Sequence, residues 1–189
     1  MAEAQVTVDG QRLALPHPYF VIATQNPVEQ AGTYPLPEAQ MDRFGIRIGL
    51  GYVSAEEELR LLDYTPEHHP LEQLSACATV SDLLAARQAA ALITVAPALR
   101  QYIVALVQAT RNHAAVQMGA SPRASIALLQ LSRALALFDG ESFVTPDVIQ
   151  EIATDVLAHR LTLDPQARYG GTSAAGVVRE ILDHLPVPV

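Results

Sequence analysis

Three side chains in this sequence combine a residue type and a position that suit contact with an anion: Asn26, Arg43 and Arg123. Asn26 follows an apolar run of strand length, residues 18–24. In open α/β sheets ligands bind beyond the carboxyl ends of the strands, where an amide could orient a water molecule or contact a phosphate. Asn26-Pro27 is also a turn signal by itself, and a turn is the simpler interpretation.

Arg123 directly follows Ser121-Pro122, a pair that predicts the start of a helix. The helix dipole disfavours a cation in the first turn, whereas the same helix end is a natural anion site. An arginine is favourable there if a phosphate lies between the guanidinium and the helix. A solvated arginine that tolerates the dipole is an equally open alternative.

Arg43 ends a predicted helical stretch, residues 38–43. A cation is favoured at a helix C-terminus, and an ion pair with Glu38 or Asp42 would be equally ordinary. The alternative is that Arg43 projects outward and reaches a phosphate held by a neighbouring molecule.

The composition limits the chemistry that the chain can perform. All 12 basic residues among its 189 are arginine, so a lysine Schiff base, a lysine general base and a complete P-loop are excluded. The net charge of −8 argues against a general binder of nucleic acids or of anionic membranes. No apolar run approaches the ~20 residues of a membrane span, and the N-terminus does not resemble a signal peptide. We therefore expect a soluble, cytoplasmic protein.

Other reactive-looking groups have simpler interpretations. The single cysteine, Cys77, lies in an apolar stretch and is predicted to be a buried, inert thiol. The pair His68-His69 lacks a helical partner with ligand spacing, so a solvated loop is favoured over a metal site. The glycines of residues 169–173 predict a flexible connector. No metal ligand is predicted.

The elements that must position these groups change in type near residue 53. Before it, Asp9-Gly10 lies between alternating segments and predicts a hairpin over residues 5–15. Two strands are expected at residues 18–24 and 44–50, with the helical stretch 38–43 between them. A hairpin and two strands cannot close a sheet, so we expect a piece of a larger α/β domain followed by helices.

After residue 53 the sequence predicts a bundle of helices, because N-cap residues and helix-starting prolines precede segments of helical periodicity. One predicted helix carries an apolar stripe that ends at Phe138. The predicted fold class is mostly α, a helical bundle preceded by a β-hairpin and two strands. The predicted helix starts are Ser54, Ser81, Pro97, Ser121, Thr145 and Ser173.

Several segments, in the same order, resemble the MoxR family of AAA+ ATPases. They are residues 20–27 (FVIATQNP), 29–44 (EQAGTYPLPEAQMDRF), 119–124 (GASPRA), 143–147 (FVTPD) and 156–161 (VLAHRL). The resemblance covers essentially the whole chain. It implies that residues 1–52 are the closing part of the AAA+ α/β core and that residues 53–189 are the α-helical lid.

The resemblance also implies roles for the three residues. Asn26 matches sensor 1, which positions the attacking water. Arg43 matches the arginine finger that acts on a nucleotide of the adjacent subunit, and Arg123 matches sensor 2, which reaches the phosphates from the lid. The family's Walker A and Walker B motifs do not occur in this sequence. We therefore expect a C-terminal piece of an ATPase that binds ATP and Mg²⁺ only as a longer protein, and that is inactive alone.

By the same resemblance, the longer protein would form a homo-oligomeric ring, expected to be a hexamer, with von Willebrand factor A-domain proteins as partners. Its ATP hydrolysis would drive chaperone-like remodelling or metal-cofactor maturation of a client. A magnesium-chelatase-type ATPase subunit and a stand-alone helical adaptor without ATPase activity are the alternatives.

Overall fold

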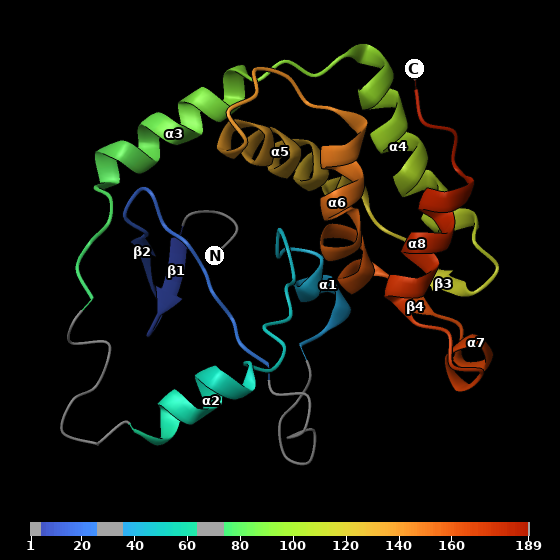
Figure 1. Cartoon of the computed structure of the whole chain (residues 1–189), viewed down its shortest axis with the longest axis horizontal. Helices are drawn as coiled ribbons and strands as arrows, with labels where there is room; N and C mark the ends of the chain where they lie inside the picture. The colour runs from blue at the N-terminus through green and yellow to red at the C-terminus, as the bar shows by residue number, and fades with distance from the viewer. Residues whose placement is uncertain (1–4, 26–35, 64–73, 189) are drawn as a thin grey trace.

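The computed structural model describes residues 5–25, 36–63 and 74–188, and the predicted mostly helical fold is confirmed (Figure 1). The helices are α1 (Glu38–Met41), α2 (Ala55–Leu62), α3 (Val80–Leu92), α4 (Pro97–Asn112), α5 (Pro122–Phe138), α6 (Pro146–Leu157), α7 (Pro165–Tyr169) and α8 (Ala174–His184), with a 3₁₀ turn η2 (Ala158–Arg160). The strands are β1 (Gln5–Val8), β2 (Gln11–Ala14), β3 (Val116–Met118) and β4 (Thr162–Leu163).

The predicted hairpin is present as the antiparallel pair β1–β2, in which Val8 faces Gln11. Asp9 and Gly10 have φ values of 49° and 78°, the left-handed conformation that a two-residue hairpin turn needs at both central positions. In contrast, the two strands predicted at residues 18–24 and 44–50 are wrong. Both segments are described and neither pairs as a strand, so Phe20 and Ile22 remain 87% and 79% exposed. A strand requires a hydrogen-bonded neighbour, and the described residues supply none for either segment.

The predicted helix starts are confirmed to within two residues because the capping groups act locally. Ser54 and Thr79 each form a capping box with the acidic residue three positions later. The helix predicted from Ser81 therefore begins slightly earlier, after Thr79. Thr145 and Ser173 cap α6 and α8 through their side-chain oxygens.

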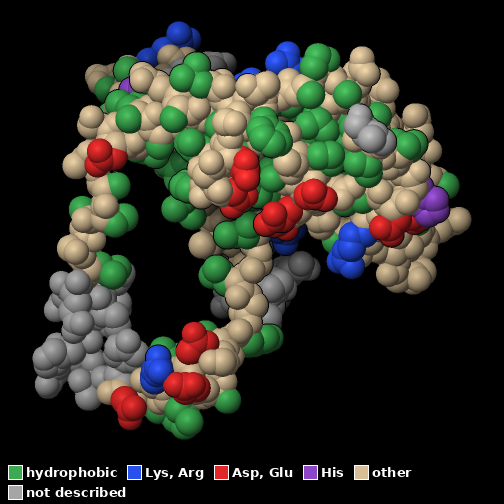
Figure 2. All heavy atoms as spheres, turned by 45° about the horizontal axis from the view of Figure 1, so that its top comes forward, with side chains coloured by type: hydrophobic (Ala, Val, Ile, Leu, Met, Phe, Trp, Pro, Cys, Tyr) green, Lys and Arg blue, Asp and Glu red, His purple; other side chains and the backbone are tan. Residues whose placement is uncertain are grey.

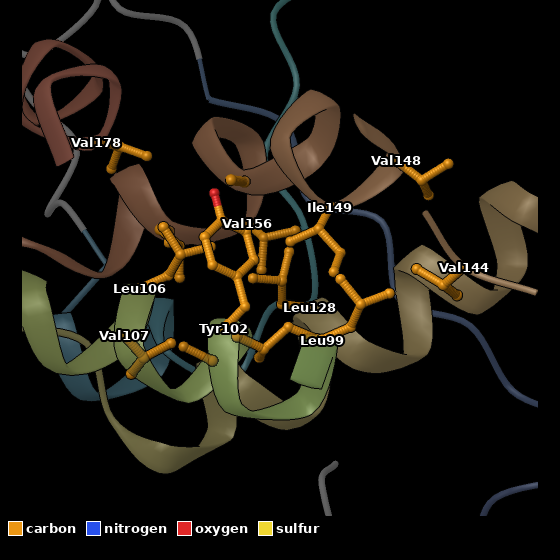
Figure 3. Close-up of a cluster of buried hydrophobic side chains, with 14 of the residues drawn as sticks. Leu99, Tyr102, Leu106, Val107, Leu128, Val144, Val148, Ile149, Val156 and Val178 are labelled. Carbon is orange, nitrogen blue, oxygen red and sulfur yellow. The ribbon is translucent and has the colours of Figure 1, made fainter. Parts of the chain in front are cut away.

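Helices α4, α5, α6 and α8 enclose one hydrophobic core and are called the helical body below (Figure 3). The buried face of α5 consists of Ala124, Leu128, Ser132 and Ala136. The predicted stripe is correct at Leu128 but wrong at Phe138, which is 83% exposed. Small residues in this face suit close packing against neighbouring helices, and the buried Ser132 hydroxyl donates to the Leu128 carbonyl at 2.7 Å.

The regions outside the helical body are much more open. Figure 2 shows apolar side chains spread over the surface, and Leu50, Tyr52 and Leu92 are each more than 80% exposed. Cys77 is also exposed, so the prediction of a buried thiol is wrong. It precedes α3, which buries none of its own residues. Among the described helices, none has the length and apolarity needed to cross a lipid bilayer.

Residues 42–47, called the docked segment below, run from the end of α1 along α6 and η2. The Arg47 amide donates to the Asp155 carbonyl at 3.0 Å. The His159 imidazole lies between two carbonyl oxygens, with Nδ1 3.0 Å from that of Asp155 and Nε2 3.1 Å from that of Phe44. These contacts attach the first part of the chain to the helical body through backbone atoms.

Replacement of a fully buried leucine should destabilise the helical body strongly. Leu106 is 0% exposed, so Leu106→Ala removes apolar contacts and leaves a cavity that costs about 2–5 kcal/mol. Leu92, 84% exposed, provides the matched control, and Leu92→Ala should change the free energy of unfolding by less than about 0.5 kcal/mol. Chemical denaturation followed by circular dichroism measures both. Equal losses would contradict the assignment of the core.

His159 should make the fold less stable as the pH falls. Burial lowers the pKa of His159 below its usual value, and the nearby charge of Arg160 adds to this effect. The unfolded chain takes up this proton near pH 6.5, whereas the folded protein takes it up only at a lower pH. The unfolded state therefore binds more protons in this window, and stability decreases as the pH falls below about 6.5.

The measurement is the thermal midpoint of the wild type and of His159→Gln between neutral and mildly acidic pH. The decrease on acidification should be smaller in the variant, because its side chain does not titrate. An equally steep decrease in both proteins would show that His159 does not contribute to it.

Candidate functional site

Asp42, at the end of α1, is the point where the docked segment meets polar side chains of the helical body and of η2. The Ser121 hydroxyl donates to its carboxylate, with Oγ 2.9 and 3.0 Å from the two oxygens. The guanidinium of Arg123 approaches Oδ2 at 3.3 Å through Nη1, and that of Arg160 approaches Oδ1 at 3.4 Å through Nε. The Asp42 side chain is only 17% exposed. The Asp42 carboxylate therefore contacts three residues that lie far from it in the sequence, Ser121, Arg123 and Arg160.

The local sequence at the start of α5 explains two of these contacts. Ser121 is the N-cap, and its Oγ accepts from the Arg123 amide at 3.2 Å while its hydroxyl proton is directed to Asp42. Pro122 supplies the first helical residue without an amide proton. An anionic carboxylate at this helix end is favourable for the dipole, and it also compensates the cation in the first turn. Arg123 is thus neither fully solvated nor unpaired.

The loop before α5 is held against the end of α4. The Ala120 amide donates to the Thr110 hydroxyl at 3.1 Å, and the Arg111 Nε donates to the Ala120 carbonyl at 2.8 Å. A Cβ at Gly119 would lie 2.6 Å from the Arg111 Cα, which no side chain can accept. The close approach therefore requires glycine and sets the position of Ser121 and Arg123.

Arg160, in η2, is the most buried charged group of the site, with 2% of its side chain exposed. It donates through Nη1 to the carbonyls of Val156 and Gly45 and through Nη2 to that of Phe44. Its Nε has no hydrogen-bond partner and lies beside Asp42. Burial lowers the pKa of Arg160 while Asp42 opposes the shift, and the guanidinium remains charged.

A cavity of about 390 Å³, called the junction cavity below, lies where these groups meet. Guanidinium groups, a hydroxyl and a helix N-terminus form the donor set of a site for a phosphate-type anion. Within the described ranges, no group of three or more His, Cys, Asp or Glu side chains could hold a metal ion. The lining of the junction cavity includes Glu38, Asp42, Gly119, Ser121, Arg123, His159 and Arg160.

The structure separates the predicted site residues. Arg123 lines the junction cavity, whereas Arg43 lines a second, larger cavity of about 810 Å³ next to Tyr19 and Phe20. Arg43 is exposed and forms no ion pair with the described residues, so the alternative of an ion pair with Glu38 or Asp42 is not observed. Asn26 lies outside the described residues, as does the pair His68-His69.

Sequence reasoning missed Asp42, Ser121 and Arg160 as members of one site. Asp42 was interpreted only as a helix-surface partner of Arg43, and Ser121 only as a helix cap. Arg160 had no signal beyond its place in the family-like segment VLAHRL. An arginine in an otherwise apolar segment could have suggested a buried guanidinium with a distant carboxylate.

The site can be set beside known proteins. Residues 108–181 match a family described as the AAA lid domain, and residues 1–46 match one described as the ATPase family associated with various cellular activities (AAA). The chain is 44% identical to the Bacillus subtilis protein YeaC over 189 residues, all of this chain and 59% of that protein. It is 38% identical to the chaperone MoxR1 of Mycobacterium tuberculosis, over all of this chain and 52% of MoxR1.

The chain is also similar to a solved structure. A crystal structure from Cytophaga hutchinsonii, described as an ATPase, superimposes with a TM-score of 0.87 at 36% identity, over 99% of this chain and 59% of that one. The chain spans little more than half the length of these relatives. The AAA match precedes the AAA lid match along the chain. The chain therefore belongs to the MoxR family of AAA+ ATPases.

Proposed function

We propose that this chain is the nucleotide-sensing part of a MoxR-type ATPase, with residues 1–52 as the end of the ATPase core and 53–189 as the lid. Arg123 contacts the phosphates of a nucleotide bound to its own subunit. Arg43 reaches the nucleotide of the adjacent subunit, and Asn26 positions the attacking water. In phosphoryl transfer, positioning and charge neutralisation supply most of the catalysis, so uncharged and cationic side chains suffice for these roles.

The single observation that carries this proposal is the placement of Arg123. Its guanidinium lies at the N-terminus of a 17-residue helix, beside the junction cavity and paired with a carboxylate. This arrangement supports binding of an anion between the lid and the core. The exposed Arg43 on a different cavity supports the second role, because a group that acts on a neighbouring subunit must be accessible from outside its own.

The junction cavity fits the phosphates of ATP better than its magnesium ion, because its carboxylate Asp42 already pairs with Ser121 and two guanidinium groups. Guanidinium and hydroxyl donors suit phosphate oxygens, whereas Mg²⁺ prefers carboxylates and water. Since the chain also has no lysine for a phosphate-binding loop, other residues have to hold the nucleotide and Mg²⁺. ATP bound there would supply the phosphoryl group that is cleaved.

The biological role is proposed from relatives. MoxR1 is named a chaperone, and we extend remodelling of client proteins, or maturation of their metal cofactors, to the protein that contains this chain. A homo-oligomeric ring, von Willebrand factor A-domain partners and a cytoplasmic location belong to the same proposal. The comparisons favour this family over a magnesium-chelatase-type subunit or an isolated adaptor.

This chain alone should bind ATP·Mg²⁺ no more tightly than in the millimolar range, because it senses phosphates without holding them. Isothermal titration calorimetry measures the dissociation constant. Micromolar binding would contradict the division of labour proposed above. An in-frame Gly-x-x-x-x-Gly-Lys-Ser/Thr encoded upstream of Met1 would support the ATPase, whereas its absence from the gene would favour the adaptor.

In the longer protein, Arg43→Ala should lower kcat by about 10³-fold or more while nucleotide affinity remains nearly unchanged, because the residue stabilises charge only in the neighbour's transition state. Arg123→Ala should instead weaken nucleotide affinity or lid closure. Arg179→Ala, on the exposed face of α8, is the control and should retain full activity.

Mixed rings test whether Arg43 acts on the adjacent subunit. Arg43→Ala subunits are combined with subunits that lack their own Walker lysine, each inactive alone. Activity should return, because intact sites then face intact arginines. Mixed rings without any recovered turnover would show that Arg43 acts within its own subunit.

A further inference from the structure

Asp42 occupies the position of an anion at the lid. Its carboxylate receives the Ser121 hydroxyl and the Arg123 guanidinium at the N-terminus of α5, which is how phosphate oxygens are bound at helix ends. A second observation supports an anion site here. The Arg160 side chain, 2% exposed, directs an Nε without a hydrogen bond toward the same carboxylate from 3.4 Å.

The same residue begins the segment that carries Arg43. Asp42 is bound immediately before Arg43, and the Phe44 carbonyl immediately after it accepts from Arg160. The Arg47 amide closes the attachment through the Asp155 carbonyl at 3.0 Å. The lid therefore holds the Asp42 side chain before Arg43 and the backbone after it, and the exposed Arg43 guanidinium makes no ion pair with the described residues.

The two guanidinium contacts to Asp42 differ in how easily they can be exchanged. Arg123 is 60% exposed and its pair with Asp42 is 3.3 Å long, so solvent screens it and it contributes little. Arg160 is buried and cannot leave without an uncompensated charge. A multiply charged phosphate that enters the junction cavity would thus take Arg123 and would also repel the neighbouring carboxylate.

We propose that Asp42 is a positioning residue that exchanges Arg123 with the phosphate chain of a nucleotide and so sets how firmly the segment bearing Arg43 is docked on the lid. Phosphate binding in one subunit would then loosen the backbone that presents Arg43 to the next subunit. The inference deepens the proposed function and rests on it for the roles of Arg123 and Arg43.

The test uses this chain and two nuclear magnetic resonance readouts. The side-chain N–H resonances of Arg123 report anion binding, and amide hydrogen exchange at Arg47 reports docking, because that amide is bonded across the junction. The probe is inorganic tripolyphosphate at millimolar concentrations, with sodium chloride at equal ionic strength as the reference. Exchange at Leu106, in the core, verifies that the helical body remains folded.

In the wild type, tripolyphosphate should shift the Arg123 resonances and speed Arg47 exchange by about two- to fivefold, the effect of losing one screened ion pair. Asp42→Asn should speed Arg47 exchange by about tenfold or more without any anion, since charge-assisted bonds are lost, and tripolyphosphate should add little. In Arg123→Ala, Arg47 exchange should not respond to the anion.

Glu151→Gln is the control, because Glu151 is an exposed carboxylate on α6 that lines neither cavity and makes no ion pair within the described chain. It should behave as the wild type. Arg123 resonances that do not respond to tripolyphosphate would overturn the proposed contact between Arg123 and phosphate. They would therefore also overturn the proposed transfer of Arg123 from Asp42 to phosphate. Responding Arg123 resonances with unchanged Arg47 exchange would overturn the coupling alone, as would wild-type Arg47 protection in Asp42→Asn.

Discussion

The arrangement of this protein depends on one buried charge, the Arg160 guanidinium, and on its partners. A side chain that is 2% exposed cannot remain charged without acceptors around it. Its acceptors are the Asp42 carboxylate, the Phe44 and Gly45 carbonyls of the docked segment, and the Val156 carbonyl of α6. The docked segment is therefore attached to η2 and α6 by a requirement of charge compensation rather than by apolar contact alone.

This attachment differs in kind from the packing of the helical body. Leu106 and Leu128 are fully buried between the helices. The stability of this part of the protein comes from the apolar area that the helices bury. The docked segment contributes few apolar side chains and is held by hydrogen bonds to Arg160, His159 and Asp155. Within this junction only the exposed Arg123–Asp42 pair can be exchanged at a small cost in free energy, whereas the buried Arg160 keeps the segment attached.

The docked segment matters for the proposed function because Asp42 and Arg43 are adjacent in the sequence. Asp42 and Arg43 are neighbours, yet the Asp42 side chain contacts Arg123 and Arg160 whereas Arg43 is exposed. Under the proposed function, the lid's contact with its own nucleotide and the arginine offered to the next subunit share one short stretch of backbone. A family of ring-forming ATPases could use such a stretch to relate neighbouring sites.

Local signals in the sequence determined the helix starts and the hairpin at Asp9-Gly10, because capping and turn formation involve residues at most three or four positions apart. Short sequence segments also indicated the family. Tertiary structure alone decided the rest. It exposed Phe138, paired β3 with β4 across more than forty residues, and left residues 18–24 without a strand partner among the described residues. It also brought Asp42 to Arg123 and Arg160, since a pair about eighty or more residues apart depends on packing that no short segment encodes.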